Sequence, residues 1–198
     1  MELGDGFREA RRVPESMDDK QRNRIFDATM TELLARGIDD FSIAGVARRA
    51  GIDPAAITGH WPDRRVLLME VMTTLAAQAA PIPDTGTLRG DLQALADATT
   101  ALVATPKGRR WMHRVLPNGQ DADLYEVSHD FWDIRLGSAA EILHRAARRG
   151  ELRVGVDPQL AIRMFAAGYY FDAIFSNVPV RPEYAEQVME IFIRGITS

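Results

Sequence analysis

The sequence contains no cysteine, and this absence excludes several kinds of site at once. Without thiols the chain cannot form disulfides, use a thiolate nucleophile, or bind zinc or an iron–sulfur cluster through cysteine. No glycine-rich phosphate loop, Ser–His–Asp order or paired-carboxylate motif stands out, and the histidines form no convincing metal-binding pair with a carboxylate at helical spacing. We therefore expect no enzyme activity, no metal and no cofactor.

Long apolar runs are also missing. No stretch approaches the roughly 20 apolar residues that a membrane-spanning helix needs, and the first residues, MELGDGFREARRVPES, lack the apolar core of a secretory signal. We expect a cytoplasmic protein without a membrane partner. An overall positive charge is absent too, because the formal net charge is -4. Binding to nucleic acid would therefore require a local basic patch.

Apolar residues recur at helical spacing through most of the chain, and no segment shows the alternation typical of a strand. The sequence therefore predicts an all-α protein. Residues 1–16 are polar and contain glycine and proline, which predicts a flexible arm. The segment APIPDTG, residues 80–86, interrupts the helical pattern. We expect one helical domain over residues 17–79 and a second over residues 80–198.

Two short helices joined by a tight turn are predicted over residues 42–60. Ser42 is a good N-cap for the first helix, which Gly51 ends. Asp53 and Pro54 are typical of the start of the second, which extends to about His60. Such a pair between two longer helices is typical of a helix-turn-helix, whose second helix enters the major groove of DNA while the first crosses the backbone.

Residues 24–72, RIFDATMTELLARGIDDFSIAGVARRAGIDPAAITGHWPDRRVLLMEVM, resemble the N-terminal domain of tetracycline-repressor (TetR) family regulators. The ordered landmarks are Gly37, Phe41-Ser42, Val46-Ala47, Ala50-Gly51, Ile57, His60-Trp61-Pro62 and Leu67-Leu68. The segments RRGELRVGVDP and PVRPEYAEQVMEIFIRGI resemble the end of one type of regulatory domain in the same family. The resemblance implies a homodimeric transcriptional regulator, usually a repressor, that a small molecule in the C-terminal domain releases from a double-stranded DNA operator.

The resemblance also implies a set of DNA-contacting residues. Ser42 would face a phosphate from the helix cap, Arg48 would face the DNA backbone, and Arg64 matches a lysine that usually meets phosphate. For Arg49 and Arg65, phosphate contact and an ordinary solvated position are equally good interpretations. The recognition helix would be lined by Asp53, Ala55, Ala56, Thr58, Gly59 and His60.

This sequence departs from the family pattern in the recognition helix. Thr58 stands where the family usually has a tyrosine, and Gly59 stands where a polar or basic residue is common. Between Asp53 and Trp61 there is no Arg, Lys, Asn or Gln, the residues best suited to base edges. Two hypotheses remain open. Phosphate contacts and DNA shape could supply most of the affinity, or the protein could be a small-molecule binding or interaction protein that has weakened or lost operator recognition.

Aromatic residues in the predicted C-terminal domain are candidates for a site that binds a small hydrophobic or amphipathic effector. Helical bundles bind ligands between their helices, although aromatic residues at helical spacing are more often plain core. Asp172 lies beside several aromatic residues, where its carboxylate needs a ligand, a cation of a second subunit, or solvent. The candidate ligand-binding residues are Trp111, Phe131, Trp132, Phe165, Tyr169 and Asp172.

The last two predicted helices are apolar on more than one side, so each must be buried on more than one side. A homodimer with a four-helix seam explains this pattern. Its two-fold symmetry would also place two helix-turn-helix units about one turn of DNA apart. The candidate interface residues are Leu160, Met164, Gly168, Phe171, Tyr184, Val188, Ile191 and Phe192.

Overall fold

The computed structural model describes residues 17–115, 122–171 and 181–197. Throughout these ranges the regular elements are α-helices, which confirms the predicted all-α class. The predicted arm over residues 1–16 and the candidate residue Asp172 lie outside the described residues.

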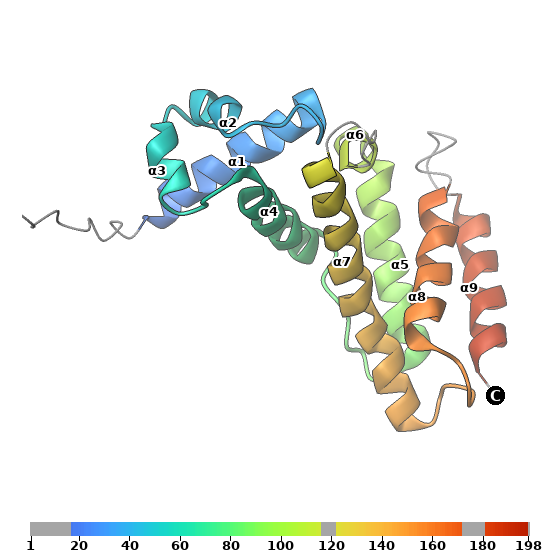
Figure 1. Ribbon diagram of the computed structural model, residues 1–198. Helices are drawn as coiled ribbons and strands as arrows, with labels where there is room; N and C mark the ends of the chain where they lie inside the picture. Colours follow the sequence, from blue (N-terminus) through green and yellow to red (C-terminus); the bar gives the residue numbers. More distant parts are fainter. Residues whose placement is uncertain (1–16, 116–121, 172–180, 198) are drawn as a thin grey trace, which may run out of the picture.

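The first four helices form the N-terminal end of the molecule (Figure 1). They are α1 (Asp19–Arg36), α2 (Ile43–Ala50), α3 (Pro54–Thr58) and α4 (Arg64–Ala79). The Ser42 hydroxyl oxygen accepts a hydrogen bond from Gly45 N–H at 3.2 Å, and an Asp53 carboxylate oxygen accepts one from Ala55 N–H at 2.8 Å. Gly51 ends α2 with a φ of 62°, a left-handed conformation that favours glycine. The predicted caps of both short helices are thus confirmed.

The remaining helices are α5 (Leu88–Ala104), α6 (Pro106–Val115), α7 (Ala122–Arg149), α8 (Pro158–Phe171) and α9 (Pro182–Ile196). The long α7 runs beside α5 and α8, and α9 packs on α8 (Figure 1). Helix α6 was not predicted from the sequence. Its buried Gly108, Met112 and Val115 and its partly buried Trp111 lie at i, i+4, i+7 and i+3, which is one helix face, so the sequence did carry a signal for this helix.

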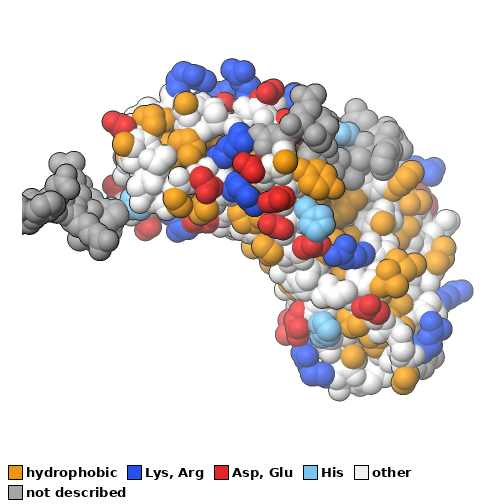
Figure 2. Space-filling model, viewed as in Figure 1, with side chains coloured by type: hydrophobic (Ala, Val, Ile, Leu, Met, Phe, Trp, Pro, Cys, Tyr) orange, Lys and Arg blue, Asp and Glu red, His pale blue; other side chains and the backbone are white. Residues whose placement is uncertain are grey.

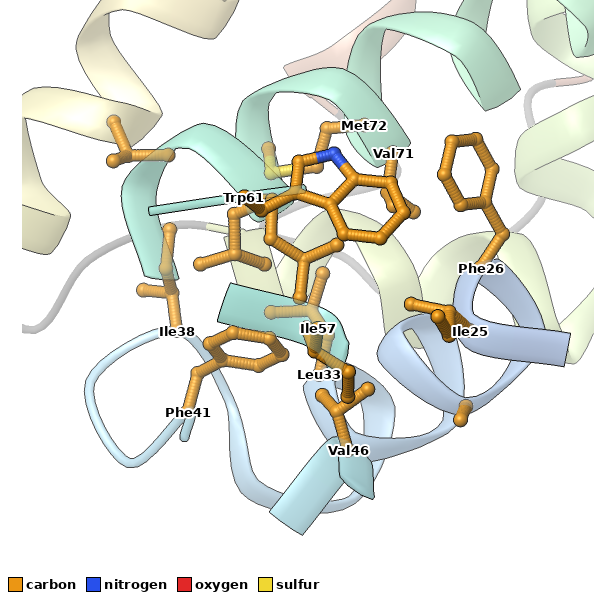
Figure 3. Packing of buried hydrophobic residues seen from close by; sticks show 14 of the residues in the cluster. Ile25, Phe26, Leu33, Ile38, Phe41, Val46, Ile57, Trp61, Val71 and Met72 are labelled. Carbon is orange, nitrogen blue, oxygen red and sulfur yellow. The ribbon is translucent and has the colours of Figure 1, made fainter. Parts of the chain in front are cut away.

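The helix-turn-helix is held on α1 and α4 by a compact apolar core (Figure 3). Ile57 of α3 is fully buried, and Val46 of α2 and Leu33 of α1 are buried beside it. Trp61 follows α3 and is only 4% exposed; its ring packs against Phe26 with the centroids 6.2 Å apart. Its indole Nε1–H donates to a Glu70 carboxylate oxygen at 2.7 Å, which fixes the loop before α4.

The same apolar cluster continues into the second half of the chain. It includes Val71 and Met72 of α4 together with Leu124, Val127 and Phe131 of α7. An ion pair between Arg65 and Glu126, 2.8 Å long, crosses the edge of this contact. The helix that follows the helix-turn-helix is therefore packed directly on the longest helix of the C-terminal half.

A buried carboxylate fixes α2 on α1. Glu32 of α1 is 2% exposed and accepts a hydrogen bond from Arg49 of α2 at 2.5 Å. Gly45 makes room for this pair, because a Cβ atom at that position would collide with the Glu32 carboxylate. Since a buried charge is costly without its partner, Arg49 has a structural role in holding the two helices together.

We expect Arg49→Ala to lower the free energy of unfolding by about 2 kcal/mol, because it leaves Glu32 buried without its cation. The matched control is Arg48→Ala on the exposed side of the same helix, which should change stability by less than about 0.5 kcal/mol. Urea unfolding followed by circular dichroism measures both. Equal stability of the two variants would show that the Glu32–Arg49 pair does not hold α2.

Candidate DNA-binding and ligand-binding sites

The residues predicted to line the recognition helix share one side of α3 and the turn after it. Ile57 faces the core and is fully buried. The predicted residues are exposed except Ala56, which is half-buried; they are Asp53, Ala55, Ala56, Thr58, Gly59 and His60. The packing of one isoleucine thus presents a short surface of small side chains to the outside.

Most polar groups on this surface are already engaged within the turn. The Asp53 carboxylate caps the helix. The Thr58 hydroxyl is placed to donate to the backbone carbonyls of Pro54 and Ala55, each 3.3 Å away. His60 is exposed and makes a tilted ring contact with Trp61 at 6.0 Å between centroids. His60 is therefore the side chain on this surface with the most freedom to form a new hydrogen bond.

Gly59 has no conformational need to be glycine. Its φ of -66° and ψ of -25° are helical, and an added Cβ would meet only the carbonyl oxygens of Ala55 and Ala56, at 3.3 and 3.8 Å. The first distance is tight, but the residue is exposed and a side chain would extend into solvent. The absence of a side chain at this position is thus a property of the surface and not a requirement of the fold.

The structure distinguishes Arg48 from Arg49 and Arg65. Arg49 pairs with Glu32 and Arg65 pairs with Glu126. Arg48, by contrast, is exposed and makes no hydrogen bond or ion pair within the described residues. Basic side chains lie along the outer edge of α2 (Figure 2). Arg48 is thus the cation of α2 that remains available for an anionic partner.

Ser42 and Arg64 lie at the starts of α2 and α4. Ser42 is exposed, and since its oxygen accepts the capping hydrogen bond, its own O–H remains able to donate. Arg64 is the first residue of α4 and is half-buried, directly after the N-cap Asp63. Helix N-termini carry partial positive charge and exposed N–H groups, which suit phosphate.

The five candidate ligand-binding residues that the structure describes divide into two groups. Trp111, Phe131 and Trp132 form one aromatic cluster, with ring centroids 5.2–6.4 Å apart, and Tyr170 extends it at 5.3 Å from Trp132. Phe165 and Tyr169 belong to a second group with Phe192 of α9. The space left between α5, α7 and α8 is only about 20 Å³, room for about one water molecule.

Burial dominates the electrostatics around this space. It raises the pKa of Tyr169 to about 12, and the Tyr169 hydroxyl donates to the Ala185 carbonyl oxygen at 3.0 Å. Burial likewise raises the pKa of Tyr170 and lowers the pKa of Arg135, whose guanidinium donates to the Ala80 carbonyl oxygen at 2.5 Å. The indole N–H groups of Trp111 and Trp132 are buried and have no acceptor among the described residues.

The candidate interface residues on α8 and α9 also fall into two sets. Leu160, Met164, Phe171 and Ile191 are 57–74% exposed, an unusual position for large apolar side chains. Beside them lies a groove of about 580 Å³ between α8 and α9. The other candidates pack within the chain: a Cβ at Gly168 would lie 2.8 Å from Val188, Phe192 contacts Phe165, and Tyr184 belongs to the core around them.

In the parts of the chain that the structure describes, no three His, Asp or Glu side chains come close enough together to hold a metal ion. No helix among those residues is long and apolar enough to cross a membrane.

Comparison with known proteins gives two family matches. Residues 25–71 match the model of bacterial regulatory proteins of the tetR family. Residues 82–192, more than half of the chain, match the tetracyclin repressor-like C-terminal domain. The HTH-type transcriptional regulator AqdR of Rhodococcus erythropolis is 27% identical over 174 residues, which cover 88% of this chain and 84% of AqdR.

Solved structures show the same fold. A TetR-family transcriptional regulator from Mesorhizobium loti aligns with a TM-score of 0.68 at 20% identity, covering 93% of this chain and all of the other. The flavonoid-responsive regulator FrrA aligns with a TM-score of 0.66 at 16% identity, covering 91% of this chain and 98% of the other. The matched proteins are regulators, and the function is accordingly not enzymatic. The helix-turn-helix at one end, the helical domain at the other and the two family matches agree, and the chain belongs to the TetR family of transcriptional regulators.

Proposed function

We propose that the protein is a homodimeric repressor that binds operator DNA mainly through phosphate contacts and is released by a small hydrophobic or amphipathic effector. The observation that carries this proposal is the contrast between the two helices of the helix-turn-helix. Helix α3 presents small side chains, whereas α2 presents Arg48, a cation without a partner in the described part of the chain. Affinity would then come from the backbone, with DNA shape adding selectivity.

The phosphate contacts would come from three positions. Arg48 supplies a mobile guanidinium, Ser42 supplies a hydroxyl donor at the N-terminus of α2, and Arg64 lies at the N-terminus of α4. Such contacts orient the protein on the duplex without identifying a base. His60 is then the side chain best placed for a hydrogen bond to a base edge, and the methyl groups of Ala55 and Ala56 suit thymine methyl groups.

The second candidate function is binding of small molecules or partners without operator recognition, because the polar groups of α3 are largely hydrogen-bonded within the helix. A protein of this fold that binds small molecules or partners, and has lost operator recognition, would also show such a surface. Arg48 favours the regulator, since an exposed arginine on α2 has no structural task in the described residues. Selective DNA binding distinguishes the two functions.

Release by an effector is proposed from the aromatic cluster and from one relative, FrrA, which is named as flavonoid-responsive. An effector would act only if it bound the arrangement that does not fit DNA more tightly than the arrangement that does. The direct packing of α4 on α7 would carry such a preference to the helix-turn-helix.

We expect the purified protein to bind its own upstream promoter DNA more tightly than scrambled DNA, with an affinity that falls steeply as salt rises. Arg48→Ala should weaken binding to both DNAs and reduce the slope of log affinity against log salt by about 1. Arg148→Ala, which removes an exposed arginine at the far end of α7, is the matched control. Equal binding of both DNAs at every salt concentration would favour the second function. Fluorescence anisotropy gives all of these affinities.

Gly59→Lys should fold normally and tighten DNA binding, because the backbone at residue 59 is helical and the residue is exposed. One new phosphate contact would steepen the salt slope by about 0.9. Gly59→Ala serves as the control and should leave the slope unchanged. A slope that does not respond to the lysine would place residue 59 away from DNA.

The proposed dimer predicts that charge on the exposed apolar face of α8 and α9 separates the subunits. Met164→Asp combined with Ile191→Asp should give a folded monomer in sedimentation equilibrium, and loss of the paired half-sites should weaken operator binding by at least about 100-fold. Tyr125→Asp changes a similarly exposed apolar residue on α7 and should remain dimeric. A double variant that stays dimeric would place the interface elsewhere.

A further inference from the structure

A second groove, of about 370 Å³, lies where the N-terminal helices meet the C-terminal domain. Its walls come from α1, α4, α5 and α6, and include Met30, Leu75, Ala79, Leu102, Lys107 and Trp111. Its volume lies in the range of small-molecule sites, whereas the space beside Tyr170 holds about one water molecule. The groove uses only one of the six predicted ligand-binding residues, Trp111.

The polar side chains that line this groove can donate hydrogen bonds, and none of them is acidic. Lys107 is exposed in the first turn of α6, and it is one of only two lysines in the chain. The Nε1–H of Trp111 is buried, so the Trp111 side chain contributes apolar ring surface to the groove. Gln78 can donate as well as accept, and no carboxylate is among the residues that line the groove. The Thr105 hydroxyl is engaged with the Leu102 carbonyl oxygen at 2.9 Å. The exposed side-chain donors of the groove are Lys107 and Gln78, and they suit a ligand group that only accepts hydrogen bonds.

The rest of the wall is apolar. It consists of Leu75, Ala76 and Ala79 of α4 and Leu102 of α5. The Trp111 ring also lines the groove, and it makes an edge contact with Phe131 with the ring centroids 5.6 Å apart. An ammonium at one edge and an apolar surface beside it match a molecule with an anionic head and a hydrocarbon body. We propose that this groove binds an amphipathic carboxylate, with its head on Lys107 and its body against Leu75, Leu102 and Trp111.

The groove lies beside a helix that is tied to both halves of the molecule. At the start of α6, Arg109 donates to the carbonyl oxygens of Val103 and Ala104 at 3.1 and 2.7 Å, and a Cβ at Gly108 would overlap the Leu102 carbonyl. At its end, the Arg114 carbonyl oxygen accepts from Ile38 N–H, just after α1, at 3.1 Å. Figure 1 shows α6 beside the end of α1. A ligand here touches both halves; an effect on DNA binding additionally rests on the proposed function.

The test uses octanoate as the probe, with 1-octanol and octyltrimethylammonium as neutral and cationic counterparts. The full chain is labelled with 5-fluorotryptophan, which gives three ¹⁹F resonances because the chain has three tryptophans. Trp111→Phe identifies the resonance of Trp111. We expect octanoate to shift that resonance, to leave the resonance of Trp61 unchanged, and to bind more tightly than either counterpart.

Three substitutions make the test specific. Lys107→Met should weaken octanoate binding by about tenfold, since a charged hydrogen bond is lost, while Lys107→Arg should retain it. Lys20→Met removes the other lysine, on the exposed start of α1, and should have no effect. Ala79→Phe fills the groove and should abolish the shift of the Trp111 resonance while leaving the circular dichroism spectrum unchanged.

The proposal is overturned if octanoate and 1-octanol bind equally and Lys107→Met changes neither affinity. It is also overturned if Ala79→Phe still binds octanoate with the wild-type shift. These titrations contain no DNA, so a negative result would overturn the carboxylate site without bearing on operator binding. Conversely, if the protein binds octanoate at Trp111 but shows no selective DNA binding, the carboxylate site stands and the proposed regulatory function is wrong.

Discussion

The contact between α4 and α7 is the constraint on which both halves of the molecule depend. Val71 and Met72 of α4 share one apolar cluster with Leu124 and Phe131 of α7. Since α4 also carries the loop that Trp61 and Glu70 fix after α3, the position of α3 follows the position of α4. Close-packed interiors transmit displacements because they contain few voids. A change at α7 would therefore reach the helix-turn-helix without an intervening flexible linker.

The helix-turn-helix has a well-packed core, but its outer surface carries few polar side chains that are free to bind DNA. Ile57, Trp61 and Val46 are buried, and the Glu32–Arg49 pair ties α2 to α1. On the outer side, α3 offers small residues whose polar groups serve its own backbone. A scaffold this well held can orient a few cations accurately on a duplex, and this is the physical basis for expecting phosphate contacts to dominate over base contacts.

The sequence predicted the features that depend on neighbouring residues. Ser42, Gly51 and Asp53 were assigned as caps because capping is local, and the structure confirms them. Distant partners were not accessible from the sequence: Arg49 binds a residue 17 positions away and Arg65 one 61 positions away, so the ion pairs of these two arginines were not predicted. Helix α6 was not predicted, although Trp111, Met112 and Val115 form an apolar face at helical spacing. The groove beside it could not be predicted from a local pattern, since four separate helices form its walls.

Hydroxyl-radical footprinting on the native promoter tests whether phosphate contacts dominate DNA binding, because it reports contact with the DNA backbone and not with the bases. We expect two protected patches of backbone, related by two-fold symmetry and separated by about one turn of the duplex, or about 10 base pairs. The protection should weaken as salt rises. If the folded dimer protected no backbone at low salt, DNA binding through phosphate contacts would be wrong.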